Sequence, residues 1–482
     1  MTDVALLFPK SWVGNNIGRM PLTFLHLNGY LKANTDIKAQ IFDESVHDVA
    51  AELKRLKEPP VCIGISCMTG IQIKHGLELA KSAREIFPGT PIVWGGWHPT
   101  LLPDNCLENP LVDFVVRGQG ERALTELVGA LRGNGAGIES VSNLSYKKDG
   151  VNTHNPSHGV VDFLKDLKVD YTVIPFAKYL RPQTLGDHAT GVISSMGCPF
   201  HCGFCSVAEV YKQKFFFRNV EFLLDEIEWM VKEHGVNYFR FDDDNLFIKK
   251  EHTRALCAGI LERGLDVQWD AGAHASLINK AFDDDTISLA RQAGCKMIYI
   301  GAESGSDAAL KQIQKKSTVA DSLLFVKTMH KFGIRPELSV MVSFPKMDID
   351  DVKYTFDMLF EARELAPEVG LRIFPYTPYP GTRMYQDAIE AGFIPPATME
   401  EWAGHWLTNF RGPWTKKSLT GFLKHFQAYY FPYSGEQVMG KSRLKYLLRL
   451  ILHPIAAWRV RHKFYFLPLD AMLVTWMRRK DF

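Results

Sequence analysis

Short apolar runs alternate with amphipathic segments through the first 135 residues of the chain. The apolar runs are rich in β-branched residues and cover 4–8, 37–42, 61–66, 91–96 and 112–116. Helically spaced apolar positions lie between them, near 21–33, 45–57, 71–87 and 121–132. Strands and helices in this order predict a doubly wound, Rossmann-like parallel sheet, in which ligands bind at the carboxyl ends of the strands.

The same alternation returns after residue 190, beyond a stretch of low periodicity with a hairpin signal at Asp149-Gly150. The expected strands cover 191–195, 238–242, 267–271, 297–301, 337–343 and 371–376. The expected helices lie near 219–234, 249–263, 284–293, 318–332 and 349–365. These units predict a partial (β/α)6 barrel of the TIM type, whose chemistry lies at the carboxyl ends of its strands.

The patterns divide the chain into four expected parts. They are a Rossmann-like domain at 1–135, a linker with a hairpin at 136–188, the partial barrel at 189–395 and a helical region at 396–482. The 482 residues are 46% hydrophobic and 23% charged, which is typical of a folded globular protein. The eight cysteines do not form a secreted disulfide framework, and neither a signal peptide nor an apolar run of about 18 residues is visible, so we expect a cytoplasmic protein.

The net charge of +2 conceals a basic tail. From residue 441 onward ten Lys or Arg residues face two Asp residues, a balance of +8 that leaves −6 for the rest of the chain. Apolar stretches at 444–458 and 464–477 accompany these charges, with Trp458 and Trp476 among them. This pattern resembles an interfacial amphipathic segment and predicts contact of 441–482 with an anionic membrane surface. A helical cap on the barrel is the alternative, and no nucleic-acid-binding module accompanies the tail.

Three cysteines stand within eight positions, at Cys198, Cys202 and Cys205. A zinc site completed by a histidine, such as His201 in the same segment, and ordinary buried thiols are two interpretations of this C-x3-C-x2-C spacing. The tight spacing beside a barrel strand favours a third, an iron–sulfur cluster held at three corners. Such a cluster leaves one iron open for a substrate or a cofactor.

The cysteine motif and the segments that follow it resemble the radical S-adenosylmethionine (radical SAM) superfamily. "FRFDDDNLF" (239–247), "IGAESGSD" (300–307) and "PYPGT" (378–382) resemble further motifs of that family, in order across 191–385. Met196 and His274 stand where related chains often carry Arg. The resemblance implies a 4Fe-4S cluster on the three cysteines and reductive cleavage of S-adenosylmethionine (SAM) at its open iron. The implied SAM contacts are Phe204, Asp242, Asp243, Asp244, Glu303, Ser304 and Ser343.

The N-terminal domain resembles the cobalamin-binding domains that precede some radical SAM barrels. "GGWHPTLLPD" (95–104) and "VDFVVRGQGERALTEL" (112–127) match signatures of that group. The D-x-H-x-x-G motif, whose His ligates cobalt in other cobalamin proteins, is absent from 9–18, and we expect His98 to shape a loop or contact the corrin instead. The implied cobalamin contacts are Ser66, Thr69, Gly95, Gly96, His98, Gly118, Gly120 and Glu121.

Together these resemblances imply an enzyme that activates an unactivated carbon with a SAM-derived radical. Methyl transfer from cobalamin is the expected outcome, and ring formation or rearrangement on a lipid or tetrapyrrole-like substrate is the alternative. A corrinoid-binding sensor without catalysis and a zinc-dependent nucleic-acid binder are hypotheses from other classes. The resemblance further implies an external electron donor such as flavodoxin or ferredoxin. The tail favours a small, lipid-like substrate and a peripheral position at the inner face of a membrane, with no nucleic-acid partner.

Overall fold

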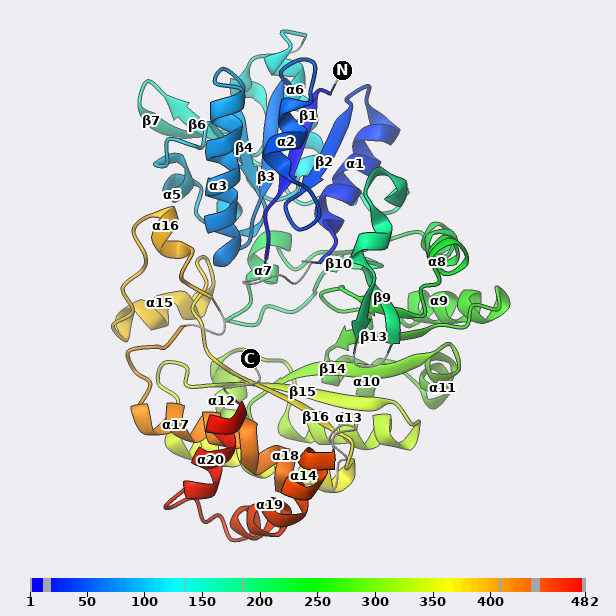
Figure 1. The fold of residues 1–482 in the computed structure, drawn as a ribbon, viewed down its shortest axis with the longest axis vertical. Helices are drawn as coiled ribbons and strands as arrows, with labels where there is room; N and C mark the ends of the chain where they lie inside the picture. The colour runs from blue at the N-terminus through cyan, green and yellow to red at the C-terminus, as the bar shows by residue number, and fades with distance from the viewer. Residues whose placement is uncertain are drawn as a thin grey trace.

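Two seven-stranded sheets stacked end to end form the body of the molecule (Figure 1). The computed structural model describes residues 2–11, 19–134, 136–183, 186–406, 410–434 and 443–478. Both sheets consist mainly of parallel strands, each connected to the next by helices, as the alternating pattern of the sequence predicts.

The first sheet has the strand order β2-β1-β3-β4-β5-β6-β7. Its strands are β1 (Val4–Phe8), β2 (Ala39–Asp43), β3 (Cys62–Ser66), β4 (Ile92–Gly95), β5 (Phe114–Val116), β6 (Leu144–Lys148) and β7 (Val151–His154). Its helices are α1 (Leu22–Asn34), α2 (Val49–Lys54), α3 (Ile71–Ile86), α4 (Trp97–Leu101), α5 (Pro103–Leu107) and α6 (Gly120–Leu131). β1 to β5 are parallel, and β6 and β7 add an antiparallel hairpin at one edge.

Helices cover both faces of this first sheet. α1 packs beside α6 on one face, and α2 packs beside α3 on the other. Alternate residues of β1 therefore enter two separate cores, with Val4 and Leu6 in one and Ala5 and Leu7 in the other. Burial on both faces explains why the strand is an unbroken apolar run instead of an alternating one.

The second sheet has the order β16-β15-β14-β13-β12-β9-β8. Its strands are β8 (Arg181–Gln183), β9 (Gly186–Val192), β12 (Tyr238–Phe241), β13 (Gln268–Ala273), β14 (Cys295–Glu303), β15 (Arg335–Val342) and β16 (Gly370–Pro375). Six of them are parallel, and β8 is antiparallel to β9. β8 and β16 lie at opposite edges, so the sheet is the expected open half-barrel.

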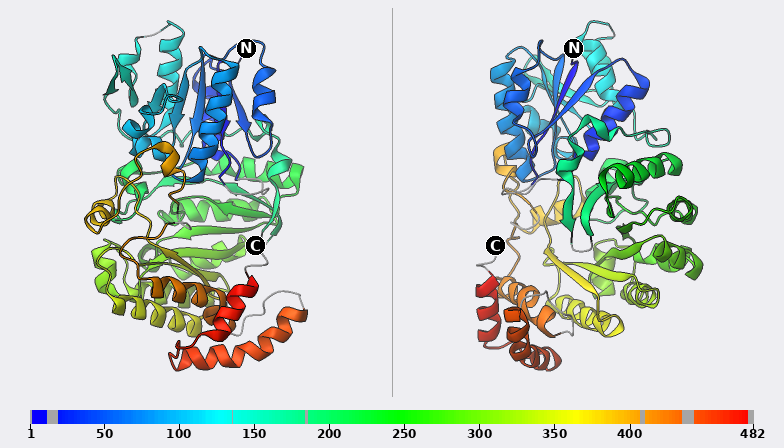
Figure 2. Two further views of the ribbon diagram at one scale, coloured as in Figure 1. Left: turned by 60° about the vertical axis from the view of Figure 1, so that its left-hand side comes forward. Right: turned by 45° about the vertical axis from the view of Figure 1, so that its right-hand side comes forward.

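Most helices between these strands gather on the convex side of the half-barrel (Figure 2). They are α8 (Val220–His234), α9 (Lys250–Glu262), α10 (Ala275–Ala281), α11 (Asp284–Gln292), α13 (Val319–Lys331) and α14 (Ile349–Leu365). The short helices α7 (Ser206–Tyr211) and α12 (Asp307–Gln312) lie near the barrel mouth instead, since α7 packs against α4 and Ile313, directly after α12, accepts a hydrogen bond from Gly203. Phe239, Phe241 and Trp269 are fully buried in the core beneath the helices of the convex side. Arg240 and Tyr299 instead line a pocket on the concave side, so the two faces of these strands differ in polarity.

One strand differs from its expected bounds. The run 191–195 was expected to be a single strand, but β9 ends at Val192, and Ser195–Gly197 form β10, which pairs antiparallel with β11 (Phe215–Phe217). Gly197 permits the close approach, because a Cβ there would lie 2.2 Å from the Lys214 carbonyl oxygen. The cysteine segment therefore leaves from a two-stranded ribbon above the barrel and not directly from the first barrel strand.

The expected linker at 136–188 is shared between the two sheets, since β6 and β7 extend the first and β8 extends the second. The C-terminal region is helical. It contains α15 (Arg383–Glu390), α16 (Met399–Trp402), α17 (Lys417–His425), a π-helical turn (Phe426–Tyr430), α18 (Phe431–Ser434), α19 (Arg443–Arg461) and α20 (Leu469–Arg478). Within the described ranges, no helix is long and apolar enough to cross a bilayer.

Candidate active site

The three cysteines lie on a loop between β10 and α7, which begins directly after Cys205. The Cys205 amide donates a hydrogen bond to the Cys202 carbonyl at 3.0 Å. Gly203 joins the loop to the far side of the barrel mouth, because its amide donates to Ile313 O and its carbonyl accepts from the Met384 amide, both at 2.9 Å. Burial raises the pKa of the Cys198 thiol to about 11 and of the Cys205 thiol to about 12, so metal binding must displace protons from both.

The spacing of the three sulfurs bears on which metal they could hold. Four ligands around one zinc ion at 2.3 Å place sulfur atoms about 3.8 Å apart. In the described part of the chain, the one group of three potential ligand atoms within 4.8 Å of one another is Glu44, His75 and Glu78. The three thiols are thus spread more widely than a single zinc ion requires, and His201 in the same loop is exposed. This arrangement fits a larger cluster better than a mononuclear zinc site.

Two acidic residues after β12 hold the start of the cysteine loop. Asp243 is buried and accepts hydrogen bonds from the Ser194 amide at 2.8 Å, the Ser194 hydroxyl at 2.5 Å and the Ser195 hydroxyl at 2.6 Å. Asp244 accepts a hydrogen bond from the Gly197 amide at 2.8 Å. Burial raises the pKa of Asp243 to about 6, although the serine hydrogen bonds oppose the shift.

Asp242, their neighbour, faces the opposite way and pairs with Arg240 at 3.0 Å and with Arg19 at 3.3 Å. All three acids therefore have protein partners in this structure. Their predicted contacts with SAM stay a prediction.

Backbone strain marks two other residues predicted to contact SAM. Glu303 ends β14 with φ 62° beside a shift of strand register, and Ser343 follows β15 with φ 60°. Non-glycine residues in this region cost about 1–3 kcal/mol each, and such strain concentrates at functional sites. The Ser343 carbonyl is fixed by the Trp414 indole N–H at 2.7 Å. Ser304 is buried, with its hydroxyl 3.2 Å from that of Thr355.

Sequence reasoning missed one charged group at this site. Lys315 is almost completely buried, and its Nζ lies 3.8 Å from a carboxylate oxygen of Glu303. Burial raises the pKa of Glu303, and the nearby charge of Lys315 partly opposes this increase. Nothing in the "QKKS" segment distinguishes Lys315 from its neighbour, because only the fold brings it under Glu303.

Aromatic residues support the cysteine loop from below and from the side. Phe200 of the loop stacks on His274 with ring centroids 3.7 Å apart. Burial lowers the pKa of His274 to about 3, so the ring is neutral where related chains often carry a charged Arg. Phe204 is half-buried against a core cluster, and the Tyr211 hydroxyl donates to the Met196 sulfur at 3.5 Å.

Six of the eight residues predicted to contact cobalamin line one pocket at the carboxyl ends of β3, β4 and β5. They are Ser66, Gly95, Gly96, Gly118, Gly120 and Glu121. A Cβ on Gly118 or Gly120 would meet no protein atom within 4 Å, so the space beside each of these lining glycines is open. A Cβ on Gly96, with φ 92°, would lie 2.8 Å from Cys67 O and from the Ser66 hydroxyl. This glycine-lined cradle has a volume of about 110 Å³, and its glycines let a ligand approach the backbone closely.

The other two residues, Thr69 and His98, lie apart from this pocket. His98 is fully buried, its Nδ1 lies 3.2 Å from the Thr69 hydroxyl, and its ring packs against Trp402 of α16. Burial lowers the pKa of His98 to about 4, so the ring is neutral. This placement favours a structural role for His98 over ligation of cobalt. The residues 12–18, most of the loop where a D-x-H-x-x-G motif would fall, lie outside the described residues.

The glycine cradle and the cysteine loop adjoin each other. α4, which begins directly after Gly96, packs against α7, which begins directly after Cys205. Trp97 and Tyr211 form an edge-to-face pair across this contact, with ring centroids 6.2 Å apart. The carboxyl ends of the first sheet point at α7 (Figure 1).

Comparison with known families assigns both the domain with the glycine cradle and the half-barrel with the cysteine loop. Residues 20–128 match the model of the B12 binding domain, and residues 192–359 match that of the radical SAM superfamily. The chain belongs to the cobalamin-dependent radical SAM enzymes. The expected fold and family are therefore confirmed, as are the three cofactors that its two domains imply: cobalamin, a 4Fe-4S cluster and SAM.

The curated relatives of this radical SAM enzyme include more than one kind of catalyst. An uncharacterized methyltransferase of Pyrococcus horikoshii is 29% identical over 375 residues, which cover 77% of this chain and 78% of the relative. The anaerobic magnesium-protoporphyrin IX monomethyl ester cyclase of Rubrivivax gelatinosus is 26% identical, with 80% and 67% covered.

Two solved structures share the fold. The radical SAM methyltransferase TsrM of Kitasatospora setae has a TM-score of 0.69 at 17% identity, covering 82% of this chain and 80% of that one. The cobalamin-dependent enzyme OxsB has a TM-score of 0.76 at 17% identity, covering 99% of this chain and 75% of its own.

Proposed function

We propose that this enzyme transfers a methyl group to an unactivated carbon of a small-molecule substrate. The observation that carries the proposal is the contact between α4 and α7, which sets the glycine cradle beside the cysteine loop. When bound, the cluster with SAM supplies hydrogen-atom abstraction, and cobalamin supplies the methyl group. The two chemistries must act on one carbon, and the α4–α7 contact gives both cofactor sites access to the same barrel mouth.

The protein's own residues have distinct roles in this proposal. Cys198, Cys202 and Cys205 hold the cluster, while Asp243 and Asp244 fix the backbone from which their loop departs. The strained Glu303 and Ser343, with Ser304, present polar groups to SAM at the ends of β14 and β15, and Phe204 packs near its adenine. The six cradle residues contact the corrin, and Thr69 with His98 support the cradle from behind.

Anaerobic reconstitution tests the assignment. The protein should hold about four irons per chain and, with reduced flavodoxin, ferredoxin or dithionite as electron donor, convert SAM to 5′-deoxyadenosine. Cys202→Ala should abolish this cleavage, whereas Cys257→Ala, which removes a buried thiol behind the barrel, should retain it. Zinc without iron, or full cleavage by Cys202→Ala, would overturn the cluster assignment. An iron-loaded protein that binds cobalamin but never cleaves SAM would instead be a sensor.

Ring formation is the second candidate, and the 26% identity to a curated ring-forming cyclase supports it. The isotopic fate of the methyl group separates the two reactions. With SAM that carries a deuterated methyl group, a methyltransferase product retains the label on carbon. A cyclase product contains no label, although 5′-deoxyadenosine is still formed.

The C-terminal helices support a peripheral contact with a membrane. Eleven of the twenty exposed large apolar side chains among the described residues lie between 450 and 476. They are Leu450, Ile451, Ile455, Trp458, Phe464, Phe466, Leu467, Leu469, Met472, Leu473 and Trp476. A patch of this kind on a helical surface with basic residues fits the interface of an anionic bilayer. Lys441, Arg479 and Lys480, which also belong to the basic tail, lie outside the described residues.

A mainly apolar groove lies between the end of β15 and the segment that joins α19 to α20. It has a volume of about 750 Å³ and extends from Ser343 at the end of β15 to Lys463 and Tyr465 between α19 and α20. Phe356, Phe360 and Phe422 are among its apolar lining residues. The groove supports a lipid-like substrate that enters from the membrane side.

Flotation with vesicles tests the membrane contact. The full chain should float with phosphatidylglycerol-containing vesicles and less with neutral ones, because the tail is basic. Ile451→Asp with Leu473→Asp should abolish flotation, while Leu261→Asp with Leu324→Asp, at exposed positions of the barrel helices, should not. Equal flotation of both double variants, or none by the wild type, would contradict the proposal.

A further inference from the structure

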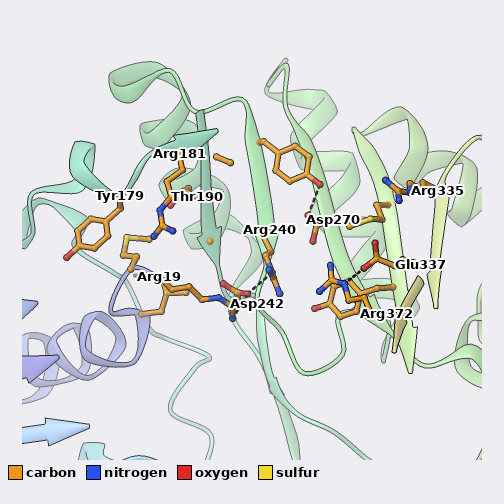
Figure 3. A pocket seen from close by; sticks show the side chains of 17 residues that line it. Arg19, Tyr179, Arg181, Thr190, Arg240, Asp242, Asp270, Arg335, Glu337 and Arg372 are labelled. Atoms are coloured by element: carbon orange, nitrogen blue, oxygen red, sulfur yellow. Dashed lines mark hydrogen bonds and ion pairs between the residues drawn. The ribbon is translucent and has the colours of Figure 1, made fainter. Parts of the chain in front are cut away.

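The concave face of the half-barrel holds a pocket of unusual charge. It has a volume of about 220 Å³ and is lined by the inward-facing residues of β9 and β12 to β16, closed at one side by residues 19–22 and 179–181 (Figure 3). Five guanidinium groups line it, those of Arg19, Arg181, Arg240, Arg335 and Arg372. Only three carboxylates of the described residues accompany them, those of Asp242, Asp270 and Glu337.

The three carboxylates are already engaged. Asp242 is shared by Arg19 and Arg240, and Glu337 pairs with Arg372 at 2.5 Å. Asp270 accepts a hydrogen bond at 2.6 Å from the Tyr238 hydroxyl, and its partner is therefore not an arginine. Burial raises the pKa of Asp270, which further reduces the negative charge available in the pocket. The pocket is therefore left with a surplus of positive charge in a recess partly shielded from water.

Among the described residues, Arg335 lacks the ion pair that Arg19, Arg240 and Arg372 each make. Its Nε is buried without a hydrogen-bond partner, and among the described residues no carboxylate lies within 4.0 Å of its guanidinium. Arg372, on the neighbouring edge strand β16, retains donors because only its Nε faces Glu337 and its side chain is 47% exposed. The two residues lie on adjacent strands but four register positions apart, because Arg335 pairs with Met297, whereas Arg372 pairs with Ser339, the partner of Gly301. Their free donors can therefore approach a planar or tetrahedral oxyanion from two levels of the pocket.

Two glycines above this charged layer give room to the side chains of Tyr299 and Glu303. A Cβ on Gly272 would lie 2.8 Å from the Tyr299 ring, and a Cβ on Gly301 would lie 2.0 Å from the Glu303 carboxylate. Tyr299 lines the pocket, and Glu303 lies four residues further along the same strand. At a rise of about 3.3 Å per residue, Tyr299 lies about 13 Å below Glu303, one of the residues that we assign to SAM.

We propose that this pocket binds an oxyanion of the substrate, a carboxylate or a phosphate monoester, through Arg335 and Arg372. The inference rests on the proposed function, because it makes the pocket the part of the active site that anchors substrate below the reacting carbon. An anchored substrate would extend from the pocket toward the residues that we assign to SAM. A substrate without an anion would bury unpaired guanidinium groups, which is costly.

Three small probes, each built on a benzene ring, test whether the pocket binds an oxyanion. Phthalate, phenyl phosphate and phthalamide should be titrated calorimetrically into the reconstituted, SAM-loaded enzyme. We expect one or both anions to bind and the neutral diamide not to bind. Comparison of the two anions then shows whether the site prefers a carboxylate or a phosphate.

Arginine variants locate the binding. Arg335→Gln and Arg372→Gln should each weaken binding of the preferred anion about tenfold or more. Arg122→Gln, which removes an exposed arginine on α6, is the matched control and should leave it unchanged. Arg372 is half exposed at a sheet edge, so its variant tests the proposal even where Arg335→Gln impairs folding.

Three outcomes would overturn the inference: equal binding of the diamide, no binding of either anion, or unchanged binding by a folded Arg372→Gln. The same preparations report on the proposed function independently. A protein that cleaves SAM but binds no anion would refute only the inference, whereas one that never cleaves SAM would refute the proposed function.

Discussion

The two parallel sheets present their ligand sites in different ways. Helices cover both faces of the first sheet, so its ligand can approach only the strand ends, and the site there consists of loop glycines and backbone. The second sheet is covered on its convex side only, and its open concave face carries charged side chains along the strands themselves. Both sheets therefore offer sites at their strand ends, and the face that helices leave open gives the second sheet a further pocket lined by its strands.

A substitution that fills the glycine cradle should produce the largest effect, a loss of cobalamin affinity at the first sheet alone. Gly120→Leu places a side chain in the pocket with no protein atom within 4 Å of its Cβ, so the protein should fold normally. We expect cobalamin affinity to fall well over tenfold, because the ligand and the side chain compete for one space. Equilibrium dialysis measures it, while SAM cleavage should persist.

The same helix offers the control. A Cβ on Gly129 of α6 also meets no protein atom within 4 Å, but Gly129 does not line the cradle. Gly129→Leu should bind cobalamin like the wild type. Loss of cobalamin in both variants would indicate damage to α6 instead of a filled site.

A methyl group added on the second sheet should weaken SAM binding and leave cobalamin binding unchanged. In Gly301→Ala the new Cβ would collide with the Glu303 carboxylate and displace it from Lys315. SAM affinity should fall about tenfold, while cobalamin affinity stays unchanged. Gly89→Ala, in open space on the first domain, is the control. If SAM binding were unaffected, Glu303 would not be a SAM contact.

A smaller effect concerns the carboxylate that fixes the cysteine loop. Burial raises the pKa of Asp243 from its usual 3.8 to about 6. Below about pH 3 the residue is protonated in both the folded and the unfolded chain. As the pH rises from about 3 to above 7, the unfolded chain ionises first, so unfolding releases a proton and stability falls by about 3 kcal/mol in all.

Denaturant unfolding of the cluster-free protein across this range measures the effect. Asp243→Asn cannot ionise and should lose this part of the pH dependence, whereas Asp266→Asn, at an exposed position before β13, should retain it. An identical pH profile for wild type and Asp243→Asn would show that the carboxyl titrates normally.

Much of the architecture follows from the sequence because its elements bury regular apolar patterns. β1 to β5 and the long helices fall within a few residues of their expected bounds, and the cysteine motif is visible from its spacing alone. The break between β9 and β10 was not predictable, since it depends on a pairing of Ser195 with Phe217, twenty-two residues away.

The interior of the barrel was equally hidden from sequence reasoning. Arg240, Arg335 and Arg372 stand as isolated charges in three strands that are otherwise read as ordinary β segments. Only the curvature of the sheet collects them on one face. Lys315 was missed for the same reason, because its meeting with Glu303 depends on the turn after α12.

The two hydrogen bonds of Gly203 also determine when this protein can mature. Their partners, Ile313 and Met384, are synthesised 110 and 181 residues after it. A nascent chain that has only just exposed its cysteines therefore lacks the braces that shape their loop. The loop can reach its final form only after residue 384 has left the ribosome, when nearly the whole barrel has been synthesised.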